Sequence, residues 1–398
     1  MKKLLLLGGL RYLIPVIKKA KALGYYVITC DYIPDNIAHS YSDEYHNVSI
    51  IDKEAVLELA QRLEIDGIMS FAVDPGVPTA SYVAEKMGLC FPPYASVQIL
   101  QNKGLFRQFL KDNHFNVPFA YSYKTKEAAQ AQNFDYPVIV KPVDSAGSKG
   151  VTKVSSANEL NEAIDVALKF SIGGEYIIEE FIEPLGYSTD CDSFSINNQM
   201  IITTFDNQHF DKKAANPYTP AAYSWPPLMQ TEHQELLRSE IQRLVKLLNL
   251  GTSIYNIETR VGTNGTPYIM ELSPRGGGNR LAEMVHHVYG VDLIEMTVRG
   301  VMGEEINPND FEPTTENRYL AELILHADNS GIYQSIEIDP RFEANVIELD
   351  LWVNEGDTIN AFNGANDTIG TMVLKFDTQE ELNAVFEGEQ SIYTITVK

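Results

Sequence analysis

The sequence predicts an α/β protein whose N-terminal part forms an open, parallel β-sheet. Three observations lead to this fold class. Apolar runs alternate with helical patterns from Lys3 to Phe71. Two strand-like runs flank Asn264-Gly265, the strongest short-range signal for a β-hairpin. The chain after Arg318 alternates strand-like runs with acidic turns, which predicts a small antiparallel sheet.

Size and charge narrow the class of protein. The chain has 398 residues, enough for two or three domains with sizeable cores. Its hydrophobic content of 44% and charged content of 21% are those of an ordinary soluble globular protein. The formal charge of −23 argues against nucleic acid or an anionic membrane as the main partner. A nucleotide is still compatible, because a local basic pocket can oppose the global sign.

Cysteine usage and the N-terminus indicate the compartment. Cys30, Cys90 and Cys191 are widely spaced and contain no C-x-x-C pair, which fits a reducing compartment and gives no support for a structural zinc. The N-terminal run of leucines is too short for a signal sequence or a membrane span. We therefore expect a cytoplasmic enzyme.

The N-terminal part is predicted to be a β-α-β-α-β unit. Lys3–Gly9 is an apolar run that ends in two glycines, as a buried parallel strand and its turn would. Tyr12–Leu23 has helical spacing and stops before Gly24, a natural residue just past a helix end. The remaining elements are a strand at Tyr26–Asp31, a helix at Asp52–Leu63 and a strand at Gly67–Phe71.

The turn at Gly8-Gly9, followed by Asp31, also resembles a dinucleotide-binding fingerprint, in which the acid binds a ribose. The second and third glycines of G-x-G-x-x-G are missing, however. We therefore favour a Rossmann-like domain whose turn binds another ligand, or none, over one that binds NAD.

Phe91-Pro92-Pro93 is typical of a domain boundary. A helical pattern over Ser96–Asp112 follows it and carries Lys103.

Two further stretches suggest nucleotide binding. Pro137–Val140 is a short apolar strand that leads into Lys141 and the small-residue loop 144–150. The backbone amides of such a loop can approach phosphate oxygens, although G-x-x-x-x-G-K-[ST] is absent and this is no Walker A loop. Tyr176–Ile182, YIIEEFI, is either a strand end with solvated acids or a linker whose backbone reads an adenine edge.

The hairpin around Asn264-Gly265 brings two acids together. If these are the central residues of a two-residue turn, Glu258 lies directly opposite Glu271. Two carboxylates in that position repel, so a divalent cation between them would explain the arrangement. The alternative is a solvent-exposed face on which neighbouring arginines, Arg260 and Arg275, partly neutralise the charge of the two acids. The same face should also carry Asn256, Arg260, Ile269 and Ser273.

Three motifs occur in a fixed order: K-P-x-x-x-x-G-S-x-G-V from Lys141, E-E-F-I from Glu179 and E-x12-E-L-S-P-R from Glu258. Together they resemble the motifs of the ATP-grasp carboxylate–amine ligases, most of all those of L-amino acid ligases and the carbamoyl-phosphate synthetase large subunit. The resemblance implies an ATP-grasp fold, α/β with α+β character overall. It implies a Rossmann-like pre-ATP-grasp domain at 1–92, an ATP-grasp domain at 93–300 with a flexible lid at about 115–180, and a C-terminal α+β extension at 301–398.

The resemblance also implies which residues bind ATP. Lys141 would bridge phosphate and adenine, and Gly186 stands where the family usually has a ribose-binding glutamate, so that Glu183 is the candidate substitute. The other implied ligands are Lys103 at the phosphates, Ser145, Gly147, Ser148 and Gly150 in the flexible loop Ser145–Gly150, and Glu179, Glu180 and Ile182 in the adenine linker.

The metal and catalytic residues are implied at the hairpin. Glu258 and Glu271 would hold magnesium, with manganese as the alternative ion. Ser273 stands where the family usually has a metal-binding asparagine, and its hydroxyl is a weaker oxygen ligand. Arg275 would steady the acyl phosphate and the tetrahedral intermediate, and is the candidate catalytic residue together with Lys141.

The implied reaction needs no nucleophilic side chain. A carboxylate attacks the γ-phosphate of ATP, and the acyl phosphate then reacts with an amine to give an amide, ADP and phosphate. We expect small-molecule substrates, one of them an amino acid, and a homodimer of the kind common among relatives. The alternatives are an ATP-grasp carboxylase or carbamoyl-phosphate-type enzyme, and a nucleotide-binding module without turnover.

The residues that would select the substrate are predicted from position alone. The loop-like region 205–227 resembles the amino-acid pocket of L-amino acid ligases, and surface packing is the alternative. Gly276–Gly278 would let the backbone approach the substrate, although a strand-to-helix turn needs glycine as well. His286-His287 lack the i, i+4 spacing of a metal pair, so we expect packing or capping. The pocket candidates are His209, Tyr223 and Trp225.

Overall fold

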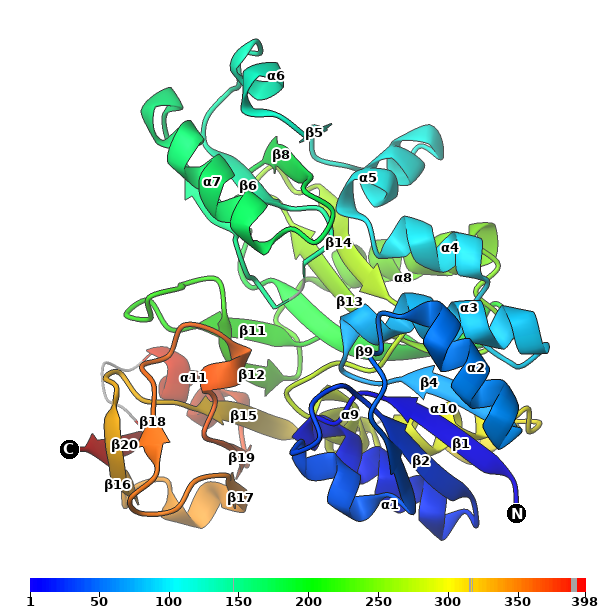
Figure 1. Cartoon of the computed structure of the whole chain (residues 1–398). Helices are drawn as coiled ribbons and strands as arrows, with labels where there is room; N and C mark the ends of the chain where they lie inside the picture. Colours follow the sequence, from blue (N-terminus) through cyan, green and yellow to red (C-terminus); the bar gives the residue numbers. More distant parts are fainter. Residues whose placement is uncertain (146, 315, 317, 388–391) are drawn as a thin grey trace. The chain divides into compact units, whose positions relative to one another are not determined.

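The computed structural model describes the chain except residues 146, 315, 317 and 388–391. By its internal contacts the chain divides into two compact units (Figure 1). Unit 1 consists of Met1–Val117, Asp190–Thr204 and Gln230–Thr315, and unit 2 of Pro118–Thr189, Phe205–Met229 and Glu316–Lys398. Both units are therefore discontinuous in sequence. The division into three domains at 92 and 300 stays a prediction.

Unit 1 begins with a parallel sheet in the order β3-β2-β1-β4. Leu4–Leu7 are fully buried, as expected for a strand covered on both faces. Asp52 caps the second helix by accepting a hydrogen bond from the Ala55 amide (3.1 Å). The β-α-β-α-β prediction is confirmed, with β3 as an additional edge strand. The elements are β1 (Lys3–Leu7), β2 (Tyr26–Cys30), β3 (Glu44–His46), β4 (Gly67–Ser70), α1 (Ile14–Ala22), α2 (Lys53–Leu63) and α3 (Val77–Met87).

The turn after β1 is filled by protein. A Cβ on Gly9 would lie 2.5 Å from the His39 ring, so the glycine is needed for this packing. The Asp31 carboxylate accepts hydrogen bonds from the Tyr32 amide (2.7 Å) and from Asn36 Nδ2 (2.8 Å). Both features of the apparent dinucleotide fingerprint therefore have a local structural use, and the choice between NAD, another ligand and none stays a prediction.

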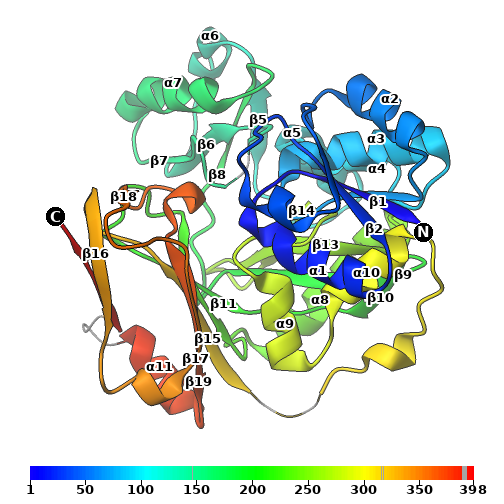
Figure 2. The ribbon, with the colours of Figure 1, turned by 60° about the horizontal axis from the view of Figure 1, so that its bottom comes forward.

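The second sheet of unit 1 contains the hairpin, in the order β10-β9-β13-β14. Helices α4 and α8 pack on β14, and α10 contacts β13 and α1 (Figure 2). The single helix predicted over Ser96–Asp112 is wrong: it is two helices, because Asn102 caps the second by accepting from the Leu105 amide (3.0 Å). The elements are β9 (Thr189–Ile196), β10 (Gln199–Ile202), β13 (Ser253–Val261), β14 (Pro267–Ser273), α4 (Tyr94–Leu100), α5 (Lys103–Asp112), α8 (Thr231–Leu247), α9 (Leu281–Tyr289) and α10 (Leu293–Val301).

The hairpin turn differs from the predicted one. Gly262 N donates to Thr266 O (2.8 Å), so three residues close the loop instead of two, with Gly265 at φ +77°. Next to the turn, the strands therefore pair one residue out of the predicted register. A β-bulge between Glu258 and Thr259 brings them back into it.

Glu258 therefore still lies opposite Glu271, as predicted, and Asn256 lies opposite Ser273. Ile269 was expected on this face, and that expectation is wrong, because the bulge pairs it with Thr259.

The first sheet of unit 2 is antiparallel, in the order β5-β8-β6-β7. Val138, Val140, Ile164 and Ile178 form the core between this sheet and α7. The predicted strands before Lys141 and at YIIEE are confirmed. The elements are β5 (Ala120–Tyr123), β6 (Val138–Pro142), β7 (Thr152–Val154), β8 (Tyr176–Glu180), α6 (Lys126–Gln130) and α7 (Leu160–Phe170).

The rest of unit 2 has a five-stranded sheet in the order β11-β12-β15-β19-β17 and a three-stranded sheet in the order β18-β16-β20. The region 205–227 was expected to be a loop, and this is wrong in part: it contributes two strands, because β12 pairs along β15. The elements are β11 (Asn207–Phe210), β12 (Pro220–Trp225), β15 (Tyr319–Leu325), β16 (Gly331–Ile338), β17 (Val346–Leu351), β18 (Thr358–Ile359), β19 (Gly370–Phe376), β20 (Tyr393–Val397) and α11 (Gln379–Glu387). No helix in the described part of the chain is long and apolar enough to cross a membrane.

Gly276 and Gly277, between β14 and α9, are required by protein packing. A Cβ on Gly276 would lie 2.2 Å from the Phe71 ring, and one on Gly277 would lie 2.9 Å from the Asp192 carboxylate. Gly276 O also accepts from the Ala72 amide (3.1 Å). The turn interpretation thus accounts for these two glycines, whereas a Cβ on Gly278 would meet nothing closer than Tyr12 at 3.8 Å.

We predict that Gly276→Ala destabilises the protein by about 1–3 kcal/mol, because the methyl group overpacks the contact with Phe71. The measurement is the melting temperature. Gly278→Ala is the matched control and should change stability by less than about 0.5 kcal/mol. Equal melting temperatures for the two variants would contradict the packing argument.

Candidate active site

The opposed carboxylates of the hairpin each have a basic neighbour. Lys103 Nζ lies 3.1 Å from Glu271, and Arg260 Nη2 lies 3.4 Å from Glu258. The side chains of Glu258 and Glu271 are 34% and 32% exposed, so both are accessible to a ligand. Burial lowers the pKa of Lys103, but the charge of Glu271 outweighs this and raises that pKa above its ordinary value. Lys103 is therefore a cation at neutral pH.

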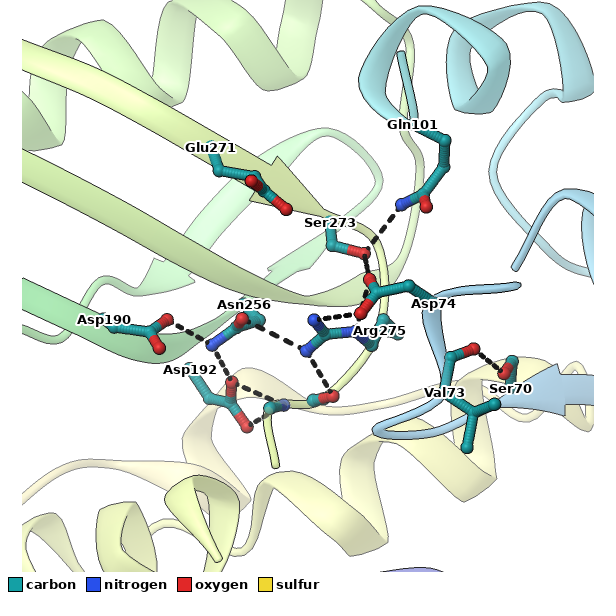
Figure 3. Close-up of polar contacts among 12 residues, drawn as sticks. Ser70, Val73, Asp74, Gln101, Asp190, Asp192, Asn256, Glu271, Ser273 and Arg275 are labelled. Carbon is teal, nitrogen blue, oxygen red and sulfur yellow. Dashed lines mark hydrogen bonds and ion pairs between the residues drawn. The ribbon is translucent and has the colours of Figure 1, made fainter. Parts of the chain in front are cut away.

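Ser273 follows Glu271 on β14, and its hydroxyl is committed to protein partners (Figure 3). It donates to Asp74 Oδ1 (2.9 Å) and accepts from Gln101 Nε2 (2.8 Å). The side chain is buried, with 1% of the residue exposed. Its cross-strand partner in the sheet is Asn256 on β13.

Arg275 is held from several sides. Nε and Nη2 donate to the two carboxylate oxygens of Asp74, each at 2.8 Å, and Nη1 donates to Asn256 Oδ1 (3.1 Å) and Gly276 O (2.9 Å). Burial would raise the pKa of Asp74, but the charge and hydrogen bonds of Arg275 hold that pKa below its usual range. The pair is therefore ionised and bidentate, the strongest form of such a contact.

Two further acids lie next to Asn256, on strand β9 (Figure 3). Asn256 Nδ2 donates to Asp190 Oδ1 (2.8 Å) and to Asp192 Oδ1 (3.3 Å). The Gly277 amide also donates to Asp192. Burial, helped by the charge of Glu258, raises the pKa of Asp190 to about 7, and burial raises the pKa of Asp192 to about 7.

Sequence reasoning missed Asp74, Gln101, Asp190 and Asp192. A signal was present for the two acids of β9, because TDCDSF places them two residues apart on one face of a strand. A weaker signal marked Asp74, which follows the carboxyl end of a parallel strand, where ligand-binding side chains commonly lie. Nothing in the sequence marked Gln101.

In unit 2 the predicted nucleotide residues lie around β6 and β8. Lys141 forms an ion pair with Glu179, which is buried on the neighbouring strand. The loop 144–150 is anchored by Ser148, whose hydroxyl donates to Tyr218 O (3.0 Å) and whose carbonyl accepts from Asn216 Nδ2 (3.2 Å). Gly147 and Gly150 have φ of +67° and +74°, a conformation that favours glycine. Ser145 is described in the same loop, whereas Ala146 lies outside the described residues.

The predicted adenine linker follows β8. Ile182 is buried and Glu180 is half-buried. Glu183, the candidate for the ribose, is 63% exposed and lies 3.8 Å from Lys153 Nζ, which is 3.7 Å above the ring of Phe181.

The structure thus brings Lys103, Glu258, Glu271, Ser273 and Arg275 together in unit 1. It brings Lys141, the described residues of the loop 144–150 and the linker 179–183 together in unit 2. Oxygen donors of the hairpin suit magnesium or manganese. Within the described residues there is no group of three or more His, Cys, Asp or Glu side chains placed to hold a metal. The carboxylate pair would therefore need ligand oxygens or water to complete a metal's coordination.

Two of the three pocket candidates of region 205–227 are buried, and His209 is half-buried. Tyr223 and Trp225 on β12 are fully buried. His209 stacks on Phe386 with ring centroids 3.6 Å apart, and its Nε2 lies 2.9 Å from Ser224 Oγ. These are packing contacts within a sheet, not the surface packing of a loop that was the alternative from the sequence, and pocket contact stays a prediction.

Three comparisons with known proteins bear on this geometry. Residues 100–279 match the family ATP-grasp_3, an ATP-grasp domain. The chain is 26% identical over 309 residues to the formate-dependent phosphoribosylglycinamide formyltransferase of Prochlorococcus marinus (strain NATL2A), which covers 76% of this chain and 77% of that protein. Its fold is similar to that of an L-amino acid ligase from Bacillus licheniformis, with a TM-score of 0.84, 20% identity and coverage of 100% of this chain and 99% of that one. It is also similar to the biotin carboxylase domain of the 2-oxoglutarate carboxylase of Hydrogenobacter thermophilus, solved as a dimer with MgADP, ADP and bicarbonate, with a TM-score of 0.72, 16% identity and coverage of 99% and 91%.

The chain therefore carries an ATP-grasp domain and has the ATP-grasp fold, as the sequence motifs predicted. Catalysis with ATP and magnesium is what this likeness supports, and it is proposed below. The roles of individual residues and the identity of the substrates are proposals.

We predict that His209→Phe makes stability less dependent on pH. Burial lowers the pKa of His209 to about 3 in the folded protein, against about 6.5 for an unfolded chain. Between these values only the unfolded chain binds the proton, so this histidine costs stability as the pH falls from about 6.5 toward 3. Phenylalanine preserves the stack on Phe386 and removes the titration. The melting temperature between pH 7 and pH 5 should fall less steeply in the variant, and parallel curves would refute the assignment.

Proposed function

We propose that the protein is an ATP-dependent ligase that converts a carboxylate into an acyl phosphate and joins it to an amine, with an amino acid as one substrate. The observation that carries the proposal is the opposed pair Glu258 and Glu271, with Lys103 and Arg275 in the same unit. Like charges placed directly opposite destabilise a hairpin. A divalent cation bound between the two carboxylates would offset this repulsion.

Glu258 and Glu271 would hold magnesium, which would supply positive charge at the phosphate oxygens of ATP. Lys103 and Lys141 are each paired with a carboxylate in the structure, and each would donate to phosphate when nucleotide binds. The loop amides around Gly147 would cover the phosphates. Glu179, Glu180 and Ile182 would bind the adenine, and Glu183 the ribose.

The reaction has two steps, and in each step one bond forms and one leaving group departs. A carboxylate oxygen of the substrate attacks the γ-phosphorus, and ADP leaves with the electrons of the broken P–O bond. The amine nitrogen then attacks the acyl carbon, phosphate leaves, and the amine proton passes to solvent. Arg275 would stabilise the negative charge on the acyl oxygen during the second step, because a fixed guanidinium needs no reorganisation when that charge develops.

A related activity is favoured by one comparison. The Prochlorococcus relative is named a formate-dependent formyltransferase, and formate is a small carboxylate. Formate or bicarbonate in place of an amino acid is therefore the second candidate for the activated substrate.

The test is ATP turnover with magnesium and pooled carboxylates and amines, with ADP resolved from AMP and new products identified by mass spectrometry. ADP and a condensed product that depend on amino acids would support the proposal. ADP that depends on formate or bicarbonate would favour the second candidate. Formation of AMP would rule out the acyl-phosphate mechanism. Light scattering of the same preparation would test the expected homodimer.

We predict that Glu271→Ala abolishes ATP turnover, with at least a 100-fold loss, while the melting temperature without ligand changes by only a few degrees. The reason is that the variant removes an exposed ligand for the metal and leaves the core intact. MgADP should raise the melting temperature of the wild type more than ADP does, and this difference should vanish in the variant. Glu235→Gln, on the exposed face of α8, is the control. Retained turnover would remove Glu271 from the site.

A further inference from the structure

Asp74 reaches Arg275 from the parallel sheet of unit 1. It begins the 3-10 helix Asp74–Gly76 after β4, and the chain before it is pinned by Ser70 Oγ, which donates to Val73 O (2.6 Å) (Figure 3). Ala72 adopts a left-handed conformation (φ +56°) and donates its amide to Gly276 O (3.1 Å). The position of Asp74 is therefore set by the backbone of two segments far apart in sequence.

The contacts of Arg275 leave little freedom to its guanidinium. The group has five N–H donors. One on Nε and one on Nη2 go to Asp74, and the two on Nη1 go to Asn256 and Gly276. Among the described residues no acceptor is recorded for the second N–H of Nη2, so this N–H is left for a ligand, on a residue that is 8% exposed. The carboxylate of Asp74 thus decides where that single donor points.

Ser273 serves the same network. Its hydroxyl donates to Asp74 Oδ1, the oxygen that also accepts from Arg275 Nε, and its lone pair accepts from Gln101. An asparagine would present no hydroxyl at this position. The one hydroxyl proton of Ser273 and one of its lone pairs are thus in use inside the protein.

We propose that Asp74 is a positioning residue that aims Arg275, and that Ser273 holds Asp74 in place instead of acting as a metal ligand. The proposal rests on the proposed function for the role of Arg275. Asp74 touches neither nucleotide nor acyl group and acts only through the guanidinium. Ser273 stands at the position of the family's usual metal-binding asparagine, but here its hydroxyl would hold Asp74 through a hydrogen bond.

The first test is a double-mutant cycle on kcat for amide formation. Asp74→Asn should lower kcat about 100-fold, as expected for a displaced catalytic group, with the KM for ATP within twofold of the wild type. In an Arg275→Ala background the same substitution should cause no further loss. A purely structural role for Asp74 would lower kcat by the same factor in both backgrounds, and that result would overturn the proposal.

Asp74→Asn leaves a buried guanidinium without its counter-ion, so Ser273→Ala provides a milder variant. It removes the hydrogen bonds of Ser273 with Asp74 and Gln101 but keeps the charge of Asp74, and it should lower kcat about tenfold, again only when Arg275 is present. Glu304→Gln breaks a different arginine–carboxylate pair, with Arg299 (2.7 Å), and is the matched control that should leave kcat within twofold.

Two readouts are independent of turnover. Manganese binding in the presence of ADP, followed by electron paramagnetic resonance, should be within twofold of the wild type in Ser273→Ala and at least tenfold weaker in Glu271→Gln. A tenfold loss in Ser273→Ala would make Ser273 a metal ligand and refute that part of the proposal. Modification of Arg275 by phenylglyoxal, mapped by mass spectrometry, should be at least tenfold faster in Asp74→Asn, and an unchanged rate would show that Asp74 does not fix the guanidinium. If the wild type forms no amide with any substrate, the proposed function fails, and these two measurements still decide the roles of Asp74 and Ser273.

Discussion

The buried ion pair between Asp74 and Arg275 is the contact on which the hairpin end of unit 1 depends. Both groups are almost removed from water, so each would be costly without the other. The bidentate geometry and the added hydrogen bonds from Ser273 to Asp74 and from Arg275 to Asn256 satisfy the charges. Because Asp74 follows a strand of the parallel sheet while Arg275 follows β14, this ion pair joins the two sheets of unit 1, together with the hydrogen bond from the Ala72 amide to Gly276 O. The arginine is thereby held in place before any ligand arrives.

A second constraint is electrostatic. Glu258 and Glu271 face each other and form ion pairs with Arg260 and Lys103, and Asp190 and Asp192 lie on the next strand. An acidic face of this kind gains from a bound cation, as the carboxylate pairs of magnesium-dependent phosphoryl transfer do. In a chain of formal charge −23, the proposed nucleotide binding needs basic groups that oppose the overall sign locally. Lys103 and Lys141 are two such groups. Lys103 forms an ion pair with Glu271, and Lys141 forms one with Glu179.

The proposed function specifies a reaction class more sharply than a substrate. The acyl-phosphate chemistry needs a fixed cation, a metal and a phosphate loop, and these parts do not depend on what the carboxylate carries. Selection of the substrate depends on other side chains. Tyr223 and Trp225, expected to line a pocket, are instead buried in the sheet of unit 2. The comparisons accordingly include proteins named as an L-amino acid ligase, a formyltransferase and a carboxylase.

The sequence by itself determined the parallel sheet, the hairpin strands and the pairing of Glu258 with Glu271, because apolar periodicity and turn residues are local signals. It did not determine how that pairing arises. The turn has three residues and a bulge at β14 compensates, a balance settled by packing of the whole sheet. The partners of Arg275 were decided only by the tertiary structure, since Asp74 lies about 200 positions away and is joined to it through buried charge. Contacts between residues so far apart produce no periodic pattern in the sequence. The contact of Gln101 with Ser273 could therefore be found only from the folded structure.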